Sequence, residues 1–227
     1  MLILAVDTNT PAGSVAILRD RRLLAEINLD SPQTHSERLL PAVDLLLKSL
    51  GIGLPQLDGF ALAVGPGSFT GIRIGMSTVK SLAFSADRPI AAVSNLEALA
   101  YKIKQSQARL LCPLIDAKKN EVYSALFEAR AGDLQEIIPQ GLYTPDSLFS
   151  RVPAHRIVTF IGSGVPVYRD RLSDYFKDKA RLSRRSLYVG YEVGLLGYER
   201  LKAGHGLDSF QLEPLYFRKS QAEEGHR

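Results

Sequence analysis

The sequence predicts an α/β fold of two similar lobes, because one succession of elements occurs twice along the chain. Each half opens with a short apolar run followed by an aspartate, at residues 2–6 and 110–115. In each half a later apolar run leads into a glycine-rich turn, at residues 65–67 and 162–164. Short buried strands that alternate with amphipathic helices and turns are typical of α/β domains.

The first half contains five predicted strands and three predicted helices. Apolar or alternating runs between turn residues predict the strands: Leu2–Val6, Ser14–Leu18, Leu23–Leu29, Gly59–Val64 and Ile90–Val93. Helical periodicity with start or stop residues predicts His35–Leu50, Ile72–Ala86 and a helix after Ser94. The first helix follows the capping box Thr34-x-x-Glu37, and the second stops before Pro89.

The second half repeats this order of elements. Its predicted strands are Leu110–Ile115, Glu121–Glu128, Leu134–Ile138 and Ile157–Ile161. Its predicted helices are a short one opened by Thr144-Pro145, then Val167–Lys177 and Leu187–Lys202. The boundary between the halves falls near residues 104–109. We therefore expect an N-terminal lobe of residues 1–106, a C-terminal lobe of residues 107–217 and a polar tail of residues 218–227.

The composition is that of a globular protein, and we expect the protein in the cytoplasm. Hydrophobic residues make up 45% of the 227 residues and charged residues 23%. No apolar run approaches the roughly 20 residues that span a bilayer, and the opening residues lack the pattern of a signal peptide. The lone Cys112 supports no internal disulfide and fits a buried thiol. The net charge of +4 allows contact with RNA, but acids interrupt the basic clusters, which favours ordinary solvated surface.

The loop at residues 65–71 has two possible interpretations. Glycines between a buried strand and a helix can point backbone amides at an anion, so the loop could hold phosphate. The loop lacks the Gly-Lys-Ser/Thr ending of a Walker A motif, so a tight turn that packs the next helix against the sheet is favoured. The candidate phosphate contacts are Asp7, Gly65, Gly67, Ser68, Thr70 and Gly71.

Two helices carry apolar side chains away from their predicted core stripes. On the first helix, Leu39, Leu40, Ala42, Val43, Leu46, Leu47 and Leu50 form the predicted apolar face, whereas Leu45 falls among charged residues. The second helix has only two charges, Arg73 and Lys80, and is apolar nearly all round. Contact with another subunit and complete burial within the chain are both compatible with this pattern. The candidate partner contacts are Leu45, Ile74, Met76, Ser77, Lys80 and Phe84.

Three segments carry a resemblance to a known family. Residues 34–41 read Thr-His-Ser-Glu-Arg-Leu-Leu-Pro, residues 64–75 read Val-Gly-Pro-Gly-Ser-Phe-Thr-Gly-Ile-Arg-Ile-Gly, and residues 80–83 read Lys-Ser-Leu-Ala. With these segments the chain resembles the TsaB family. Residues 115–117, 121–123, 162–164 and 214–218 extend the resemblance over most of the chain.

The resemblance implies both a fold and a role. The fold is that of the duplicated ribonuclease-H-like lobes of the actin, sugar-kinase and chaperone ATPase superfamily. The role is that of a non-catalytic subunit, without a cofactor of its own, that works with the catalytic paralogue TsaD and the small ATPase TsaE. These proteins transfer threonylcarbamoyl to the adenosine beside the anticodon of transfer RNA. The resemblance also implies that the two helices form the pairing surface, with a homodimer when TsaD is absent.

An actin-like small-molecule kinase or a glycoprotease-like hydrolase is the alternative. Asn9 stands where actin-like ATPases have glycine in an Asp-x-Gly-Thr hairpin, and a side chain there opposes close approach of phosphate. TsaD has a metal-binding His-x-x-x-His where this chain has Asn95 and Leu99, so we expect no metal. His35 begins a helix and is expected at the surface without a ligand role. No serine completes a Gly-x-Ser-x-Gly elbow.

Overall fold

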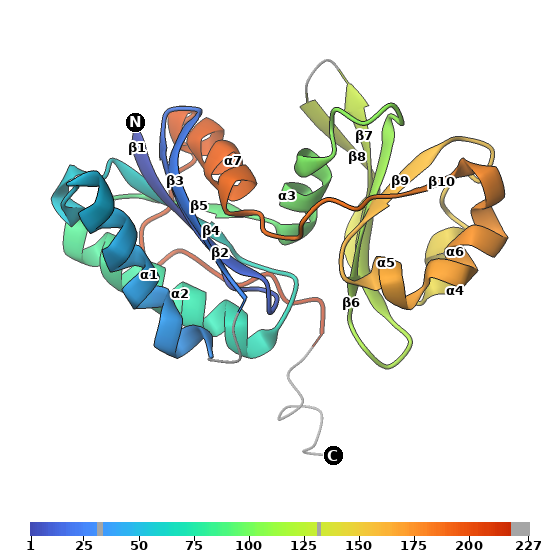
Figure 1. The fold of residues 1–227 in the computed structure, drawn as a ribbon, viewed down its shortest axis with the longest axis horizontal. Coiled ribbons are helices and arrows are strands. Elements are labelled where there is room, and N and C mark those ends of the chain that lie inside the picture. The colour runs from blue at the N-terminus through green and yellow to red at the C-terminus, as the bar shows by residue number, and fades with distance from the viewer. Residues whose placement is uncertain (31–33, 131–132, 219–227) are drawn as a thin grey trace. The chain divides into compact units, whose positions relative to one another are not determined.

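The computed structural model describes residues 1–30, 34–130 and 133–218, which fold into two compact units (Figure 1). The first unit comprises Met1–Ala98 and Tyr188–Tyr216, and the second comprises Leu99–Leu187 and the chain from Phe217 onward. Each unit contains one mixed five-stranded sheet. The predicted α/β class with two similar sheets is therefore confirmed.

The sheet of the first unit has the strand order β3-β2-β1-β4-β5. Its strands are β1 Leu2–Asp7, β2 Gly13–Arg19, β3 Arg22–Leu29, β4 Gly59–Ala63 and β5 Ile90–Val93. β1 pairs antiparallel with β2 and parallel with β4, and β4 pairs parallel with β5. The helices are α1 His35–Leu50, the 3₁₀ turn η1 Leu54–Gln56, α2 Phe69–Ala86, the start of α3 Asn95–Lys102, and α7 Gly190–Lys202.

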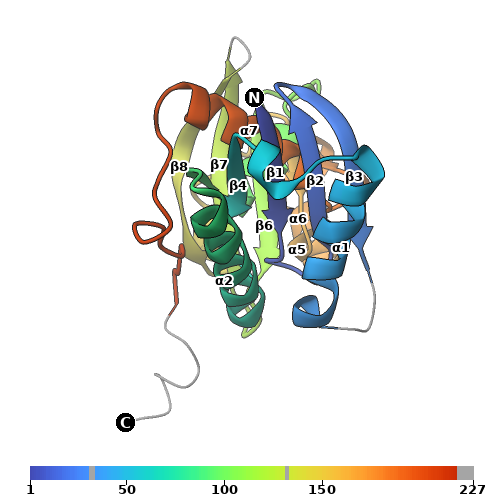
Figure 2. The ribbon, with the colours of Figure 1, turned by 90° about the vertical axis from the view of Figure 1, so that its left-hand side faces the viewer.

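The helices of this unit cover both faces of its sheet. Figure 1 shows α1 and α2 on one side and α7 on the other, and Figure 2 shows α1 and α2 side by side. The α1 and α2 side holds a core of alternating strand residues, with Leu4 and Val6 of β1 packed against residues of both helices such as Val43 and Val79. This alternation follows from the period of two along a strand.

The second unit has the strand order β10-β9-β6-β7-β8. Its strands are β6 Leu110–Asp116, β7 Val122–Arg130, β8 Asp133–Tyr143, β9 Val158–Ile161 and β10 Ala180–Leu182. Its helices are α4 Pro145–Phe149, α5 Gly164–Val167, α6 Arg169–Phe176 and the 3₁₀ turn η2 Lys177–Lys179. The core contains the packed rings of Phe149, Phe160 and Phe176. Buried Cys112 belongs to the same core, and burial raises the pKa of its thiol to about 12.

The last helix is the main difference from the predicted layout. The division at residues 106 and 107 assigned it to the C-terminal lobe, whereas in the structure α7 packs on the first sheet, against β1, β2, β4 and β5. Its glycines allow this close approach. A Cβ atom on Gly194 would lie 2.2 Å from Leu18, and one on Gly197 would lie 2.3 Å from Ala61. The sequence pattern gave no indication of which sheet this helix would cover.

Four further differences are local. Helix α2 begins at Phe69 instead of Ile72, because Ser68 caps it and accepts a hydrogen bond from the amide of Gly71. The helix predicted over residues 167–177 is α6, but the short helix α5 before it and the short strand β10 were not predicted. Arg218, expected in a loose polar tail, donates to the Ala117 carbonyl at 3.0 Å and pairs with Glu121. Residues 219–227 of that tail lie outside the described residues.

The helices in the described ranges are too short or too polar for a membrane span.

Candidate functional site

The glycine-rich loop after β4 lies directly against the turn between β1 and β2. A Cβ atom on Gly67 would lie 2.2 Å from the carbonyl oxygen of Asn9, and one on Gly71 would lie 2.0 Å from that of Thr8. One turn later in α2, a Cβ on Gly75 would lie 2.3 Å from Thr8 Oγ1. Because real Cβ contacts are never this short, the glycines are needed for close backbone packing.

The polar atoms of this loop also form hydrogen bonds with other protein groups. The amide of Ser68 donates to the Asn9 carbonyl at 2.6 Å, and the amide of Gly71 donates to Ser68 Oγ at 3.2 Å. Thr8 Oγ1 donates to the Gly71 carbonyl at 2.8 Å. Gly65 has a φ of 121°, which favours glycine for backbone reasons alone. Thr70 is exposed at the helix start. The geometry thus favours the packing interpretation over the phosphate cradle.

Asp7 is buried at the end of β1. Its Oδ1 accepts a hydrogen bond from the amide of Asn9 at 2.9 Å. Among the residues described, Asp7 Oδ2, both side-chain polar atoms of Asn9 and Ser14 Oγ have no hydrogen-bond partner. Burial raises the pKa of the Asp7 carboxyl group to about 7, although the Asn9 amide acts in the opposite direction. The Asp7 carboxyl group is therefore partly protonated at neutral pH.

His35, a possible metal ligand, is in contact with other protein groups. His35 is half-buried over the β1–β2 turn, with Nε2 2.9 Å from the Thr10 carbonyl and Nδ1 3.2 Å from the Arg38 guanidinium. Burial, followed by the nearby charge of Arg38, lowers the pKa of His35 in spite of the Thr10 contact. Asn95 and Leu99 are both buried. No group of three or more His, Cys, Asp or Glu side chains within the described ranges could hold a metal ion.

The predicted partner contacts divide between core and surface. Leu45 on α1 is 60% exposed and Phe84 on α2 is 68% exposed. Ser77 is exposed, and Ile74 and Lys80 are partly buried. Met76, by contrast, belongs to the core between α2 and the sheet. Leu45, Ser77 and Phe84 are therefore accessible on the outer side of α1 and α2, Lys80 is accessible in part, and Ile74 packs against the core.

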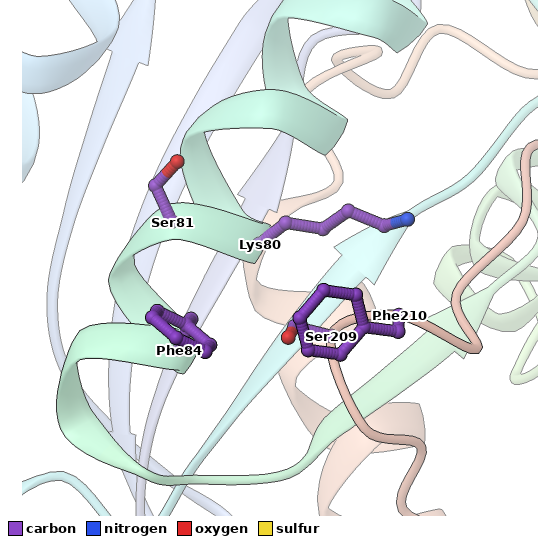
Figure 3. Close-up of a pocket in the computed structure, with 5 residues that line it drawn as sticks. All are labelled: Lys80, Ser81, Phe84, Ser209 and Phe210. Atoms are coloured by element: carbon purple, nitrogen blue, oxygen red, sulfur yellow. The ribbon is translucent and has the colours of Figure 1, made fainter.

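Sequence reasoning missed two residues of this outer side. Leu40 fits the predicted core face of α1 but is 52% exposed. Phe210 is 79% exposed in an irregular segment, where no periodicity could indicate its position. Its ring packs edge-on against Phe84, with 5.9 Å between the centroids and 81° between the planes. Figure 3 shows both rings beside an open hollow of about 300 Å³, which Lys80, Ser81 and Ser209 also line.

Comparisons with known proteins agree with this architecture. A family model described as TsaD, tRNA N6-adenosine threonylcarbamoyltransferase, matches residues 27–225. A Bacillus subtilis protein named tRNA threonylcarbamoyladenosine biosynthesis protein TsaB is 33% identical over 98% of this chain and 96% of its own length. A crystal structure of an uncharacterized Pseudomonas aeruginosa protein with similarity to peptidase YeaZ has a TM-score of 0.83. It is 32% identical, over 96% of this chain and 99% of its own.

A sugar kinase shares the fold without close sequence similarity. The ROK hexokinase from Thermus thermophilus is 11% identical, with a TM-score of 0.53 over 90% of this chain and 100% of its own. This likeness shows the fold alone. It agrees with the fold that the resemblance implies.

Proposed function

The chain belongs to the TsaB family, and on this premise we propose that it is a non-catalytic subunit of the machinery that makes threonylcarbamoyladenosine in transfer RNA. In this proposal it binds the catalytic paralogue TsaD and works with the small ATPase TsaE in the cytoplasm. The observation that carries the proposal is the outer side of α1 and α2, which exposes Leu40, Leu45 and Phe84. Large apolar side chains grouped on one side of a soluble fold are typical of a protein–protein contact.

The glycine-rich loop at residues 65–71 and the β1–β2 turn support a non-catalytic role for this subunit. The glycine loop packs against Thr8 and Asn9, so a phosphate group would have to displace protein contacts. Buried Asn95 and Leu99 offer no imidazole where the catalytic paralogue has two. A small-molecule kinase needs an open phosphate site, and the contacts of the glycine loop leave none at this position of the described chain.

Transfer RNA is proposed to reach this subunit only through the assembly. Several basic side chains of the described units are engaged by acids, including Arg171 with Asp146 and Arg130 with Glu128. Few phosphates could therefore be neutralised at once, and the salt dependence of RNA binding by the isolated chain should be shallow.

The test is an omission assay with purified components. The chain, the paralogue, the ATPase, transfer RNA and the threonylcarbamoyl donor are combined, and modified adenosine is measured with each protein left out in turn. We expect modification to depend on this chain, and the chain alone to transfer nothing. Full activity without the chain would contradict the proposal. Turnover by the chain alone that a chelator abolishes would contradict its non-catalytic part.

A further inference from the structure

The two units of the chain carry opposite net charge. Residues 99–187, in the second unit, contain 15 Lys and Arg against nine Asp and Glu, which gives a net charge of +6. Residues 1–98 and 188–216, in the first unit, contain 10 Lys and Arg against 13 Asp and Glu, which gives −3. The positive charge of the chain therefore comes mainly from the second unit, and this unit is the one that would attract a polyanion.

One continuous segment concentrates this positive charge. Residues 177–185, called here the basic segment, read Lys-Asp-Lys-Ala-Arg-Leu-Ser-Arg-Arg, so five of the nine positions are cationic and one is acidic. Lys177, Arg184 and Arg185 are exposed, and among the residues that the structure describes they pair with no carboxylate. The sequence pattern favoured ordinary solvated surface for such clusters, whereas the structure leaves these three cations available to a negative partner.

The backbone of the basic segment is held against the second unit. Its middle, Ala180–Leu182, is β10, the edge strand of the second sheet, which pairs parallel with β9 (Figure 1). The first and last side chains of this strand pack against the core of the unit. The amide of Ser183 donates to the Phe160 carbonyl at 2.8 Å, and the amide of Arg185 donates to Ser183 Oγ at 3.2 Å. Because the backbone is already fixed, a contact with a partner loses less conformational entropy.

The composition and length of the basic segment suit a nucleic-acid backbone. An extended chain rises about 3.3 Å per residue, so Arg181 and Arg185 are at most about 13 Å apart. Each strand of a nucleic-acid duplex carries one phosphate per about 3.4 Å, so the cations can reach several successive phosphates. Three of the five cations are arginines, whose planar guanidinium groups donate two hydrogen bonds to one phosphate.

An exposed aromatic ring adjoins the basic segment in the chain. Tyr175 lies near the end of α6, two residues before Lys177, and is 47% exposed. A ring of this kind can stack on an unpaired base. An acidic protein surface would also attract the cations, but it would gain nothing comparable from the ring. The ring and the RNA substrate of the proposed function therefore favour RNA as the partner.

We propose that the basic segment contacts the phosphate backbone of transfer RNA when the chain is part of the assembly. This contact rests on the proposed function and adds a direct RNA contact by the second unit, apart from the partner-binding side of α1 and α2. Three unpaired cations are too few for tight binding by the isolated chain. In the assembly the other components also hold the RNA, so the same cations act at a high effective concentration and increase the affinity.

The test removes two of these charges from the assembled complex. Transfer RNA binding to the complex of the chain and its paralogue is measured by fluorescence anisotropy at several salt concentrations. We expect Arg184→Gln/Arg185→Gln to weaken binding by about tenfold at low salt. The slope of log affinity against log salt should fall by about two, since each lost phosphate contact lowers it by about one. Because both side chains are exposed, the midpoint of thermal unfolding should not change.

Two control variants separate a local contact from a general effect of charge. Arg184→Lys/Arg185→Lys keeps both charges and should keep the wild-type salt slope. Arg19→Gln/Arg22→Gln removes two exposed cations from the first unit, and its affinity for RNA should stay close to that of the wild type. Equal losses in this control and in the Gln variant of the basic segment would show a response to net charge alone and would overturn the proposal.

The remaining outcomes also decide the proposal. Unchanged RNA affinity and salt slope in an intact complex that carries Arg184→Gln/Arg185→Gln would overturn it and leave the proposed function standing. A Gln variant that no longer copurifies with the paralogue or the ATPase would make the basic segment a protein contact, which also overturns it. A wild-type chain that does not enter the complex at all would contradict the proposed function and the RNA contact together.

Discussion

The first turn of α2 and its outer face belong to one helix and have opposite environments. At the first turn, Gly71 touches the Thr8 carbonyl and its amide is bonded to Ser68, so protein atoms fill the space. Along the outer face, Phe84 is 68% exposed and Lys80 has no carboxylate partner among the described residues. Protein atoms fill the N-terminal end of the helix, and the side that a partner could cover is open.

This difference favours partner binding by the outer face of α2 over ligand binding by the glycine-rich loop. A filled loop cannot exchange its contacts for a ligand without loss of stability, because its buried polar groups would need new partners. An exposed apolar face gains free energy when another surface covers it. Substitutions at the first turn should therefore affect folding, and substitutions on the outer face should affect association.

The largest effect is expected from Gly71→Ala. The new methyl group would lie 2.0 Å from the Thr8 carbonyl oxygen, so the backbone of the β1–β2 turn must shift. We expect a loss of about 3 kcal/mol or more in the free energy of unfolding. Denaturant titration measures this loss. Gly53→Ala is the control, because its nearest neighbours would be 3.6 Å away and its stability should change little.

The buried carboxyl group of Asp7, in the same region, should make the free energy of unfolding depend on pH. Burial raises the pKa of Asp7 from 3.8 to about 7 in the folded protein. Between these values the folded chain holds a proton that the unfolded chain releases, so stability falls as pH rises from about 4 to 7. Asp7→Asn should remove this fall and gain several kcal/mol, on the order of 3, at about pH 8. Unfolding curves at several pH values measure it, and an equal change at pH 4 and pH 8 would exclude the titration of Asp7.

The sequence predicted the elements of both regions but not their environments. The strands and the helix His35–Leu50 follow from local periodicity and capping, which act over a few residues. The space in the glycine loop is filled by atoms of the β1–β2 turn, which lies more than 50 positions earlier in the chain. Local sequence patterns do not reveal such a distant contact. The docking residues were only partly predicted, because a helical wheel places Leu40 in the core, and because Met76 was included among the candidate contacts although the same wheel places it on the core stripe of its helix. Phe210 has no periodic neighbours that could reveal it.

Ser77→Glu should disrupt the partner contact on the outer face of α2 and leave the first turn of the helix unchanged. Ser77 is exposed, so the folded monomer should keep its stability within about 0.5 kcal/mol. A carboxylate enclosed in the contact without a counter-ion costs on the order of 3 to 5 kcal/mol, against roughly 8 kcal/mol for association of micromolar strength. Light scattering and copurification with the paralogue should both show loss of binding. Leu45→Glu on α1 should behave in the same way, and a variant that unfolds would place its position in the core.

The smallest effect on stability is expected from Phe210→Ala. The ring is 79% exposed, and its edge-on contact with Phe84 is its principal aromatic contact in the described unit. Such a contact contributes about 0.5 to 1.5 kcal/mol when it is buried and less at the surface. The midpoint of thermal unfolding should therefore fall by no more than about 2 °C, since 1 kcal/mol corresponds to about 2 to 4 °C in a chain of this size. Binding of a partner to the outer side of α2 should weaken measurably, because the hollow beside Phe84 loses one of its two aromatic walls. A large fall in the midpoint with unchanged association would mean that Phe210 holds its own segment against α2 and has no role in docking.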